Sequence, residues 1–323
     1  MDVETNLPIL SICIPIYNRS EFLVRILDRF LEDRDLFEEK VYFYISDNCS
    51  TEDLKAIVDQ YVARGLNVHY HRNEENIGGD RNICACFRAG KGRYTWVMGS
   101  DDILVTGFLR QLLPDLEAGV YGLVALGGLH GDSRKIVFQD TDSMIADVHI
   151  QLTGVSQNIV ATESVPDFDF QRYVTSGMAQ VLLYMKAAGE HARNLSIHCR
   201  GYLEDDHAWS GGYDPFQVFG TNLLSLVSQA VKNGWIGKRG YRAVKRNTFR
   251  YFLCGNIYTL LIMHREGTYD ARAAWKMLWK NYSYCPYAYY YMLNKLFTSC
   301  WNLFFEKTLG LKKLRIRPIN VQV

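Results

Sequence analysis

The chain has 323 residues, 48% of them hydrophobic, and this ordinary globular composition suits one large α/β domain with an appendage. The formal net charge of +1 conceals an asymmetry, because residues 1–238 carry a net charge of −11 and residues 239–323 a net charge of +12. The longest apolar stretch, residues 284–305, is interrupted by a proline and by polar side chains, so we expect no membrane-spanning helix.

The first hundred residues alternate between strand-like and helix-like patterns. Short apolar runs predict strands, and these cover residues 10–16, 41–45, 67–71 and 94–98. Polar loops and capped segments with an apolar spacing of 3.6 residues separate the runs, as expected for helices. Alternation of this kind is typical of a parallel sheet with crossover helices.

The pattern changes after the fourth predicted strand. A further strand is expected at residues 122–126 and a hairpin-like piece at residues 135–139. Residues 140–167 show no clear period and contain Gly and Pro, so we expect a flexible loop there. Helical spacing resumes at residues 170–188 and around residues 216–233, and the remaining residues are expected to form helices dense in aromatics and cations.

Two adjacent carboxylates, Asp101 and Asp102, follow the strand predicted at residues 94–98. Like charges placed side by side repel each other, so such a pair usually needs a compensating cation. Mg²⁺ is commonly held by one or two carboxylates together with substrate phosphates, and ligands of open α/β sheets bind beyond the carboxyl ends of strands. The pattern therefore predicts a metal–diphosphate site. The alternative is a pair of capping residues that opens a helix at residues 103–113.

Four short motifs occur in order along the chain. They cover residues 12–19, 46–50, 90–102 and 202–209, the last of which reads Tyr-Leu-Glu-Asp-Asp-His-Ala-Trp. This ordered set resembles family 2 glycosyltransferases, which are nucleotide-sugar enzymes of the GT-A fold. Residues 76–82 and 99–102 are further similar to the abequosyltransferase-type branch, which builds bacterial O-antigens.

The resemblance implies a site for the donor nucleotide. Its residues are Pro15, Tyr17, Arg19, Asp47, Asp80, Arg81 and Asp101. Asp47 would accept a hydrogen bond from the nucleobase, although it could instead cap the helix that follows. Arg81 would pair with diphosphate oxygens, although it could instead be a solvated side chain paired with Asp80.

The resemblance also implies a divalent metal, Mg²⁺ or Mn²⁺, at the aspartate pair. Asp102 is the preferred ligand, and Asp101 would contact the ribose or complete the coordination shell. Gly99 and Ser100 stand where an acidic residue often precedes the pair in this family. Which carboxylate holds the metal therefore stays open.

Asp205 is the predicted general base. An attacking acceptor hydroxyl must lose a proton, and a positioned carboxylate can take it. Its acidic neighbours, Glu204 and Asp206, should raise the pKa of Asp205, because three adjacent acids are hard to ionise together. Glu204 would position Asp205 or bind the acceptor sugar, and His207 is a competing base. The alternative is a charged turn before an exposed helix.

The C-terminal region combines its positive charge with 18 aromatic residues among the last 85. Amphipathic helices with cations on one side and aromatics on the other lie at anionic membrane surfaces. We therefore expect peripheral membrane contact, for example through Lys276, Trp279 and Lys280. The alternative is a helical bundle packed on the catalytic domain. No nucleic-acid partner is expected, because no motif of that kind is found.

Together these features predict a GT-A catalytic domain over residues 1–238, with a mixed, mainly parallel sheet flanked by helices, and a basic helical region over residues 239–323. The expected reaction is the inverting transfer of a sugar from a nucleotide-diphosphate donor to a saccharide acceptor, carried by a polyprenyl diphosphate, in bacterial O-antigen or capsule synthesis. The alternatives are a nucleotidyltransferase, which would need a Gly-rich loop after the first strand, and a non-catalytic binding or assembly protein.

The predicted location is the cytoplasm, at the inner face of the bacterial plasma membrane. The start of the chain is acidic and has no apolar core, so no signal peptide is expected. The eight cysteines lack the spacing of a zinc site, which favours free thiols in a reducing compartment.

Overall fold

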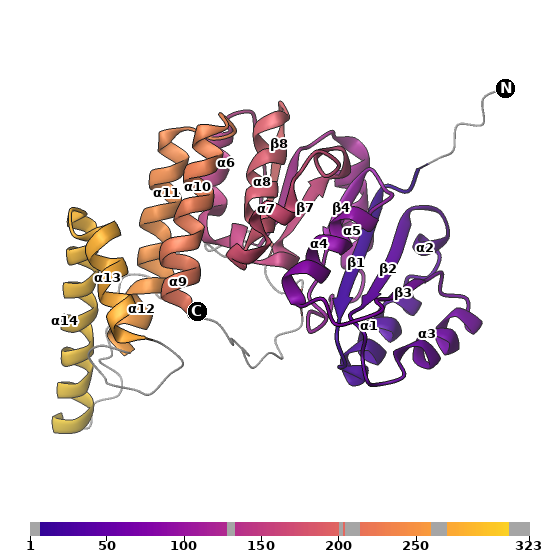
Figure 1. Ribbon diagram of the computed structural model, residues 1–323, viewed down its shortest axis with the longest axis horizontal. Helices are drawn as coiled ribbons and strands as arrows, with labels where there is room; N and C mark the ends of the chain where they lie inside the picture. Colours follow the sequence, from indigo (N-terminus) through magenta and orange to yellow (C-terminus); the bar gives the residue numbers. More distant parts are fainter. Residues whose placement is uncertain (1–6, 128–132, 200–202, 204–213, 260–269, 310–323) are drawn as a thin grey trace.

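The computed structural model describes residues 7–127, 133–199, 203, 214–259 and 270–309 (Figure 1). Within these residues, eight strands form one sheet in the order β3-β2-β1-β4-β7-β5-β8-β6. Their bounds are β1 Leu10–Ile16, β2 Val41–Asp47, β3 His69–Arg72, β4 Tyr94–Val97, β5 Leu123–Leu126, β6 Lys135–Phe138, β7 Asn158–Ala161 and β8 Asn194–Ile197. β1 pairs in parallel with β2 and β4, whereas β7 runs antiparallel to β4 and β5. The sheet is mixed and mainly parallel, which confirms the predicted fold class.

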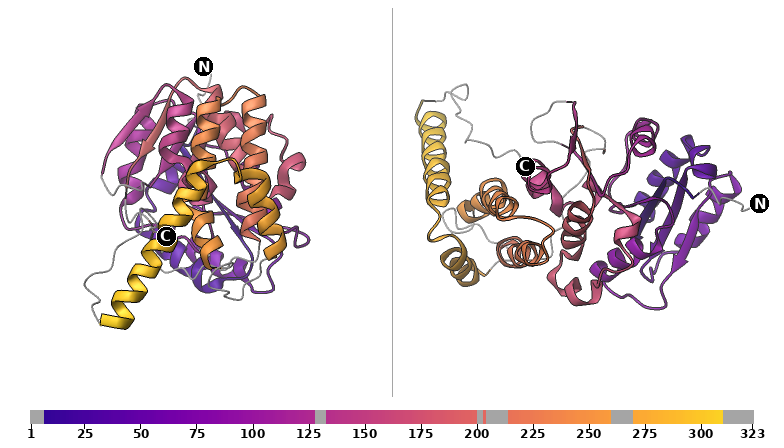
Figure 2. Two further views of the ribbon diagram at one scale, coloured as in Figure 1. Left: turned by 90° about the vertical axis from the view of Figure 1, so that its left-hand side faces the viewer. Right: turned by 90° about the horizontal axis from the view of Figure 1, so that it is seen from above.

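Helices cover both faces of this sheet (Figures 1 and 2). One layer contains α1 Ser20–Glu32, α3 Leu54–Ala63 and α5 Phe108–Ala118, and the other contains α4 Gly79–Ala89, α6 Thr141–Val148, α8 Ala179–Glu190 and α10 Leu223–Lys232. The short helices are α2 Leu36–Glu39, α7 Phe170–Tyr173 and α9 Pro215–Gln217. In β1, Ile12 and Ile14 pack in the first layer while Cys13 packs in the second. Alternate residues of a strand point to opposite faces, so both faces need cover.

The expectation of a flexible loop over residues 140–167 was wrong. This segment contains α6, strand β7 and 3-10 turns at His149–Thr153, Val155–Gln157 and Thr162–Ser164. β7 has four residues, all buried, and lies between β4 and β5. A strand that is short and buried on both faces shows no polar–apolar alternation, so its pattern could not reveal it. The Asn158 amide fixes its start by donating to the carbonyl oxygens of Gln151 and Gly154 at 2.9 and 2.8 Å.

The C-terminal region forms helices that pack on the rest of the protein. They are α11 Lys238–Thr248, α12 Cys254–Ile257, α13 Ala271–Tyr282 and α14 Pro286–Leu309, with a π-helical segment at Phe249–Leu253. A second π-helical segment, Val218–Asn222, lies before α10. Phe249 and Tyr282 belong to the same buried cluster as Val97 of β4 and Val160 of β7. The hydrophobic core therefore crosses residue 238, as the packed-bundle alternative requires.

α14 lies at the opposite end of the molecule from β1, β2 and β3 (Figures 1 and 2). Within the described residues, no helix is both long and apolar enough to cross a bilayer. All eight cysteines are free, and five of them are buried, which agrees with the thiols expected from the sequence.

We predict that Phe249→Ala destabilises the whole protein. Phe249 is 1% exposed, and truncating a buried Phe to Ala costs about 3–5 kcal/mol in free energy of unfolding. Phe297→Ala is the matched control, because Phe297 is 59% exposed and a surface change of this kind costs about 0.5 kcal/mol or less. Urea unfolding should show a single transition in each protein, and its midpoint should fall to lower urea in Phe249→Ala but not in Phe297→Ala. A variant that melts its C-terminal helices in a separate step would contradict a shared core.

Candidate active site

Three parallel strands end at one edge of the sheet. The register places Ile16 of β1 beside Asp47 of β2, and β4 pairs along the other side of β1. The chain order of the strands reverses at β1, with β2 and β3 on one side and β4 on the other. Ligands of open α/β sheets bind in the crevice outside such a reversal point. The loops after β1, β2 and β4 therefore form the expected site.

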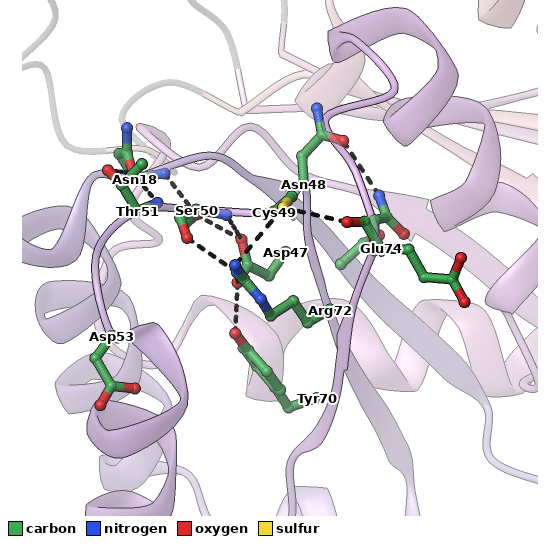
Figure 3. A network of polar contacts seen from close by, with 12 residues as sticks. Asn18, Asp47, Asn48, Cys49, Ser50, Thr51, Asp53, Tyr70, Arg72 and Glu74 are labelled. Carbon is green, nitrogen blue, oxygen red and sulfur yellow. Dashed lines mark hydrogen bonds and ion pairs between the residues drawn. The ribbon is translucent and has the colours of Figure 1, made fainter.

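The Asp47 side chain is fully buried and accepts four hydrogen bonds (Figure 3). The Ser50 amide and hydroxyl donate to Oδ1 at 2.9 and 2.5 Å, and the Tyr70 hydroxyl and Arg72 Nη1 lie 2.5 and 3.3 Å from Oδ2. Burial, together with the bond to this carboxylate, raises the pKa of Tyr70 well above its ordinary value. Asp47 does not cap α3, because Asp53 does so through the Ala56 amide.

The loop after β1 adopts an uncommon backbone conformation. Asn18 and Arg19 have φ angles of 58° and 66°, in the left-handed region that non-glycine residues rarely adopt. The Asn18 amide donates to Ser50 Oγ at 2.7 Å, and Asn18 Oδ1 accepts from the Thr51 amide at 2.9 Å (Figure 3). The β2 loop therefore holds the β1 loop in the conformation that turns Arg19 toward the aspartate pair.

Arg19 supplies a positive charge to the aspartate pair. Its Nη1 lies 2.8 Å from Asp101 Oδ2 and donates to Ser100 Oγ at 3.2 Å. Asp102 accepts a hydrogen bond from the Ser156 hydroxyl, whose oxygen in turn accepts from the Gly99 amide at 2.8 Å. Neither aspartate caps a helix, because α5 begins at Phe108. The capping alternative is thereby excluded.

Both carboxylates of the pair converge on Gly99. A Cβ atom at this position would lie 2.9 Å from Asp101 Oδ1 and 2.8 Å from Asp102 Oδ2. A side chain at residue 99 would therefore displace these carboxylate oxygens from their present positions. Two convergent carboxylates suit a hard divalent ion that takes its other ligands from substrate phosphates and water. No group of three or more His, Cys, Asp or Glu side chains gathers in the described residues, so a closed protein cage is not formed there.

The remaining predicted donor-binding residues lie near this edge. Pro15 belongs to β1, and Tyr17 beyond it is 44% exposed. Asp80 and Arg81 are exposed in the first turn of α4, and no ion pair joins them within the described part of the chain. The neighbouring Asn82 ties this turn to β2, because its Nδ2 donates to the Ser46 carbonyl oxygen at 2.9 Å.

Arg81 also lines a small cavity of about 230 Å³ beside α7. The structure brings Arg19, Asp101 and Asp102 close to one another, whereas Asp80 makes no side-chain hydrogen bond or ion pair within the described residues.

The predicted catalytic residues Glu204, Asp205 and His207 lie outside the described residues. Leu203, which immediately precedes them, is described, and it forms an antiparallel bridge with Leu104. Just before the acidic motif, the chain therefore pairs with Leu104, which follows Asp102 by two residues in the sequence.

Four polar residues at the site were not foreseen from the sequence. They are Tyr70, Arg72, Asn82 and Ser156. Ser156 lies 54 residues from the carboxylate that it contacts, in a segment without periodicity. No local signal marked it. Tyr70 and Arg72 are alternate residues at the end of a short strand, which is a pattern that could have drawn attention to them.

Residues 11–152 match the family model described as glycosyl transferase family 2. Over 116 residues, the chain is 34% identical to abequosyltransferase RfbV of Salmonella typhimurium strain LT2, which covers 35% of this chain and 34% of that protein. This similarity agrees with the resemblance to the abequosyltransferase-type branch that the motifs indicated. The chain spans about a third of the length of the curated relatives it matches.

Two solved structures share the fold. S. aureus TarS 1-349 in complex with UDP-GlcNAc superposes with a TM-score of 0.60 at 15% identity, covering 92% of this chain and 86% of that chain. Mannosyltransferase PcManGT from Pyrobaculum calidifontis, in complex with GDP-Man and Mn²⁺, gives a TM-score of 0.55 at 14% identity, covering 94% and 89%. At such low identity these likenesses show the architecture, which is the GT-A fold.

We predict that Tyr70→Phe destabilises the protein by about 1.5–3 kcal/mol, the usual worth of a hydrogen bond to a charged group. The lost hydroxyl donates to the buried Asp47 carboxylate. Tyr42→Phe is the control, because the Tyr42 hydroxyl has no hydrogen-bond partner among the described residues, and its loss should cost about 0.5 kcal/mol or less. Chemical denaturation measures both. Equal costs would contradict a structural role for the Asp47–Tyr70 bond.

Proposed function

We propose that the protein is a glycosyltransferase that moves a sugar from a nucleotide-diphosphate donor to a saccharide acceptor. The observation that carries the proposal is the convergence of Asp101 and Asp102 at the strand-order reversal of a family 2 domain, with Arg19 beside them. Carboxylates and a guanidinium at the carboxyl ends of parallel strands suit a diphosphate held with a divalent ion.

Asp102 and Asp101 would hold Mg²⁺ or Mn²⁺, which neutralises charge on the departing diphosphate when it is bound. Arg19, already paired with Asp101, adds a fixed positive charge at the same place. Arg81, at the start of α4, would reach the phosphates as they enter. These residues stabilise the leaving group, which is the part of sugar transfer where negative charge develops.

Asp47 would contribute to the nucleobase pocket with Pro15 and Tyr17. Its two oxygens already accept four hydrogen bonds, so a base N–H would have to replace one of these donors. Among the donors to Asp47, Arg72 is the nearest to solvent, because its side chain is 46% exposed whereas Ser50 is buried and Tyr70 is partly buried. Exchange of Arg72 for the base would leave the Ser50 and Tyr70 bonds intact.

Asp205 would be the general base of an inverting displacement, taking the proton of the acceptor hydroxyl as it attacks. The bridge between Leu203 and Leu104 supports this role, because Asp205 follows Leu203 by two residues in sequence. Glu204 would orient Asp205 or the acceptor.

The acceptor is proposed to be a saccharide linked to a polyprenyl diphosphate, as bacterial O-antigen or capsule synthesis would use, at the cytoplasmic face of the plasma membrane. Support comes from the similarity to abequosyltransferase RfbV and from large exposed apolar side chains on and between α13 and α14. These side chains are Trp275, Trp279, Tyr284, Tyr289, Tyr290, Leu293 and Phe297. An exposed set of aromatics beside Lys276 and Lys280 suits the interface of an anionic membrane.

Two variants separate donor binding from transfer. Nucleotide sugars are first screened for thermal stabilisation of the full chain in Mn²⁺, and hydrolysis of the stabilising sugar is then measured. Asp102→Asn should abolish both, because the diphosphate loses its metal. Asp205→Asn should keep the stabilisation and lower the hydrolysis rate by about 10²–10⁴, the usual cost of losing a general base.

Asp59→Asn serves as the control, since Asp59 is an exposed aspartate of α3 paired with Lys55. It should change neither readout. Undiminished hydrolysis in excess chelator would reject the metal, and a large loss in His207→Ala with Asp205→Asn unaffected would move the base to the histidine. Failure of every nucleotide sugar to stabilise the protein would reject the proposed activity.

Membrane contact is tested by sedimentation with vesicles. The protein should bind vesicles of anionic lipid at low salt and be partly released at high salt, because the Debye length falls from about 10 Å at 0.1 M to about 3 Å at 1 M. Trp279→Ala with Phe297→Ala should weaken binding, since these side chains are 78% and 59% exposed. Val62→Ala with Val120→Ala, exposed apolar residues outside the C-terminal helices, should not. No binding at low salt would refute the contact.

A further inference from the structure

Helix α11 carries an unusual arrangement of charge. Lys238, Arg242 and Arg246 are spaced four residues apart, so they share one face of the helix. Like charges at this spacing destabilise a helix, and α11 has no acidic residue to offset them. Arg239 is paired with Asp140, but within the described residues no carboxylate pairs with Arg242 or Arg246. Folding alone therefore does not account for this row of cations.

These cations border a cavity of about 670 Å³. It lies between α6, α11 and the turn that joins α13 to α14, and Tyr241, Tyr284 and Tyr287 also line it. Its volume falls within the range of small-molecule sites, roughly 300–1,000 Å³. The cavity thus combines guanidinium groups, two ammonium groups and phenol hydroxyls, all of which can donate hydrogen bonds to an anion.

Lys245 is the second observation that points to an anion. Its side chain lines the cavity but the residue is only 7% exposed, and no carboxylate accompanies it within the described part of the chain. Nζ donates to the Tyr284 hydroxyl at 2.9 Å and lies 5.4 and 4.6 Å from the ring centroids of Tyr282 and Tyr284. An ammonium has three donors, and a buried charge is costly unless it is paired. An anion in the cavity would provide that partner.

We propose that this cavity binds the phosphate group of an anionic membrane lipid. Arg guanidinium groups bind phosphate oxygens in a bidentate fashion, and Arg242 and Arg246 lie one helical turn apart. Tyr284 joins the cavity to the exposed aromatic side chains of α14, where the apolar part of the lipid would lie. That the bound phosphate belongs to a lipid rests on the membrane contact proposed above, whereas phosphate binding in the cavity does not depend on that contact.

The test compares two double variants that remove the same charge. Arg242→Gln with Arg246→Gln removes two of the exposed cations that line the cavity, and Lys232→Gln with Arg172→Gln removes two exposed cations elsewhere. The cavity variant should fold at least as stably as the wild type, because repulsion along α11 is relieved. Any loss of binding is therefore not a loss of fold, and thermal unfolding checks this.

Full-length protein is titrated, in chelator, with phosphatidylglycerol vesicles, phosphatidylcholine vesicles and inorganic pyrophosphate. We expect binding to phosphatidylglycerol to fall at least tenfold in the cavity variant and less than twofold in the control. If the cavity variant loses pyrophosphate binding while its vesicle binding is unchanged, the cavity binds a free phosphate compound and the assignment to a lipid is rejected. Equal behaviour of the two double variants with every probe would overturn the site. Nucleotide-sugar stabilisation in Mn²⁺, measured on the same variants, shows separately whether the proposed activity stands.

Discussion

The buried carboxylate of Asp47 organises the loops of the candidate site. A buried charge is costly unless it is hydrogen-bonded, and here Ser50, Tyr70 and Arg72 meet that requirement. Ser50 also accepts from Asn18, whose left-handed backbone directs the next residue, Arg19, to Asp101. One buried acid at the end of β2 thereby fixes the position of the cation that offsets a second acid at the end of β4.

The aspartate pair is held by residues that precede it and by residues that follow it in the sequence. Arg19 comes from the first loop of the protein, whereas Ser156 comes from a turn that precedes β7. β7 inserts between β4 and β5, so the strand that follows Ser156 is also the strand that pairs with β4. The geometry of the pair therefore depends on the completed sheet and not on the local segment that contains it.

The charge asymmetry of the chain is also a separation in space. The acidic part forms the sheet and its covering layers, and the basic helices end at the opposite side of the molecule, at α14 (Figure 1). The same helices contribute Phe249 and Tyr282 to the core while leaving Trp279 and Phe297 exposed. The basic region thus has both buried side chains that join the core and exposed aromatic side chains, so packing on the domain does not exclude the proposed membrane contact.

The sequence by itself determined the features that depend on local pattern. Apolar runs and helix caps indicate strands β1, β2 and β4 and the helices between them, because these signals depend only on neighbouring residues. The position of the Asp101–Asp102 pair directly after a strand is a local signal of the same kind. Tertiary structure decided the rest. Strand β7 has too few residues to show a period, and the contacts of Ser156 with Asp102 and of Tyr70 with Asp47 join residues 54 and 23 positions apart. Such contacts arise when distant segments pack together, and no spacing within one segment records them.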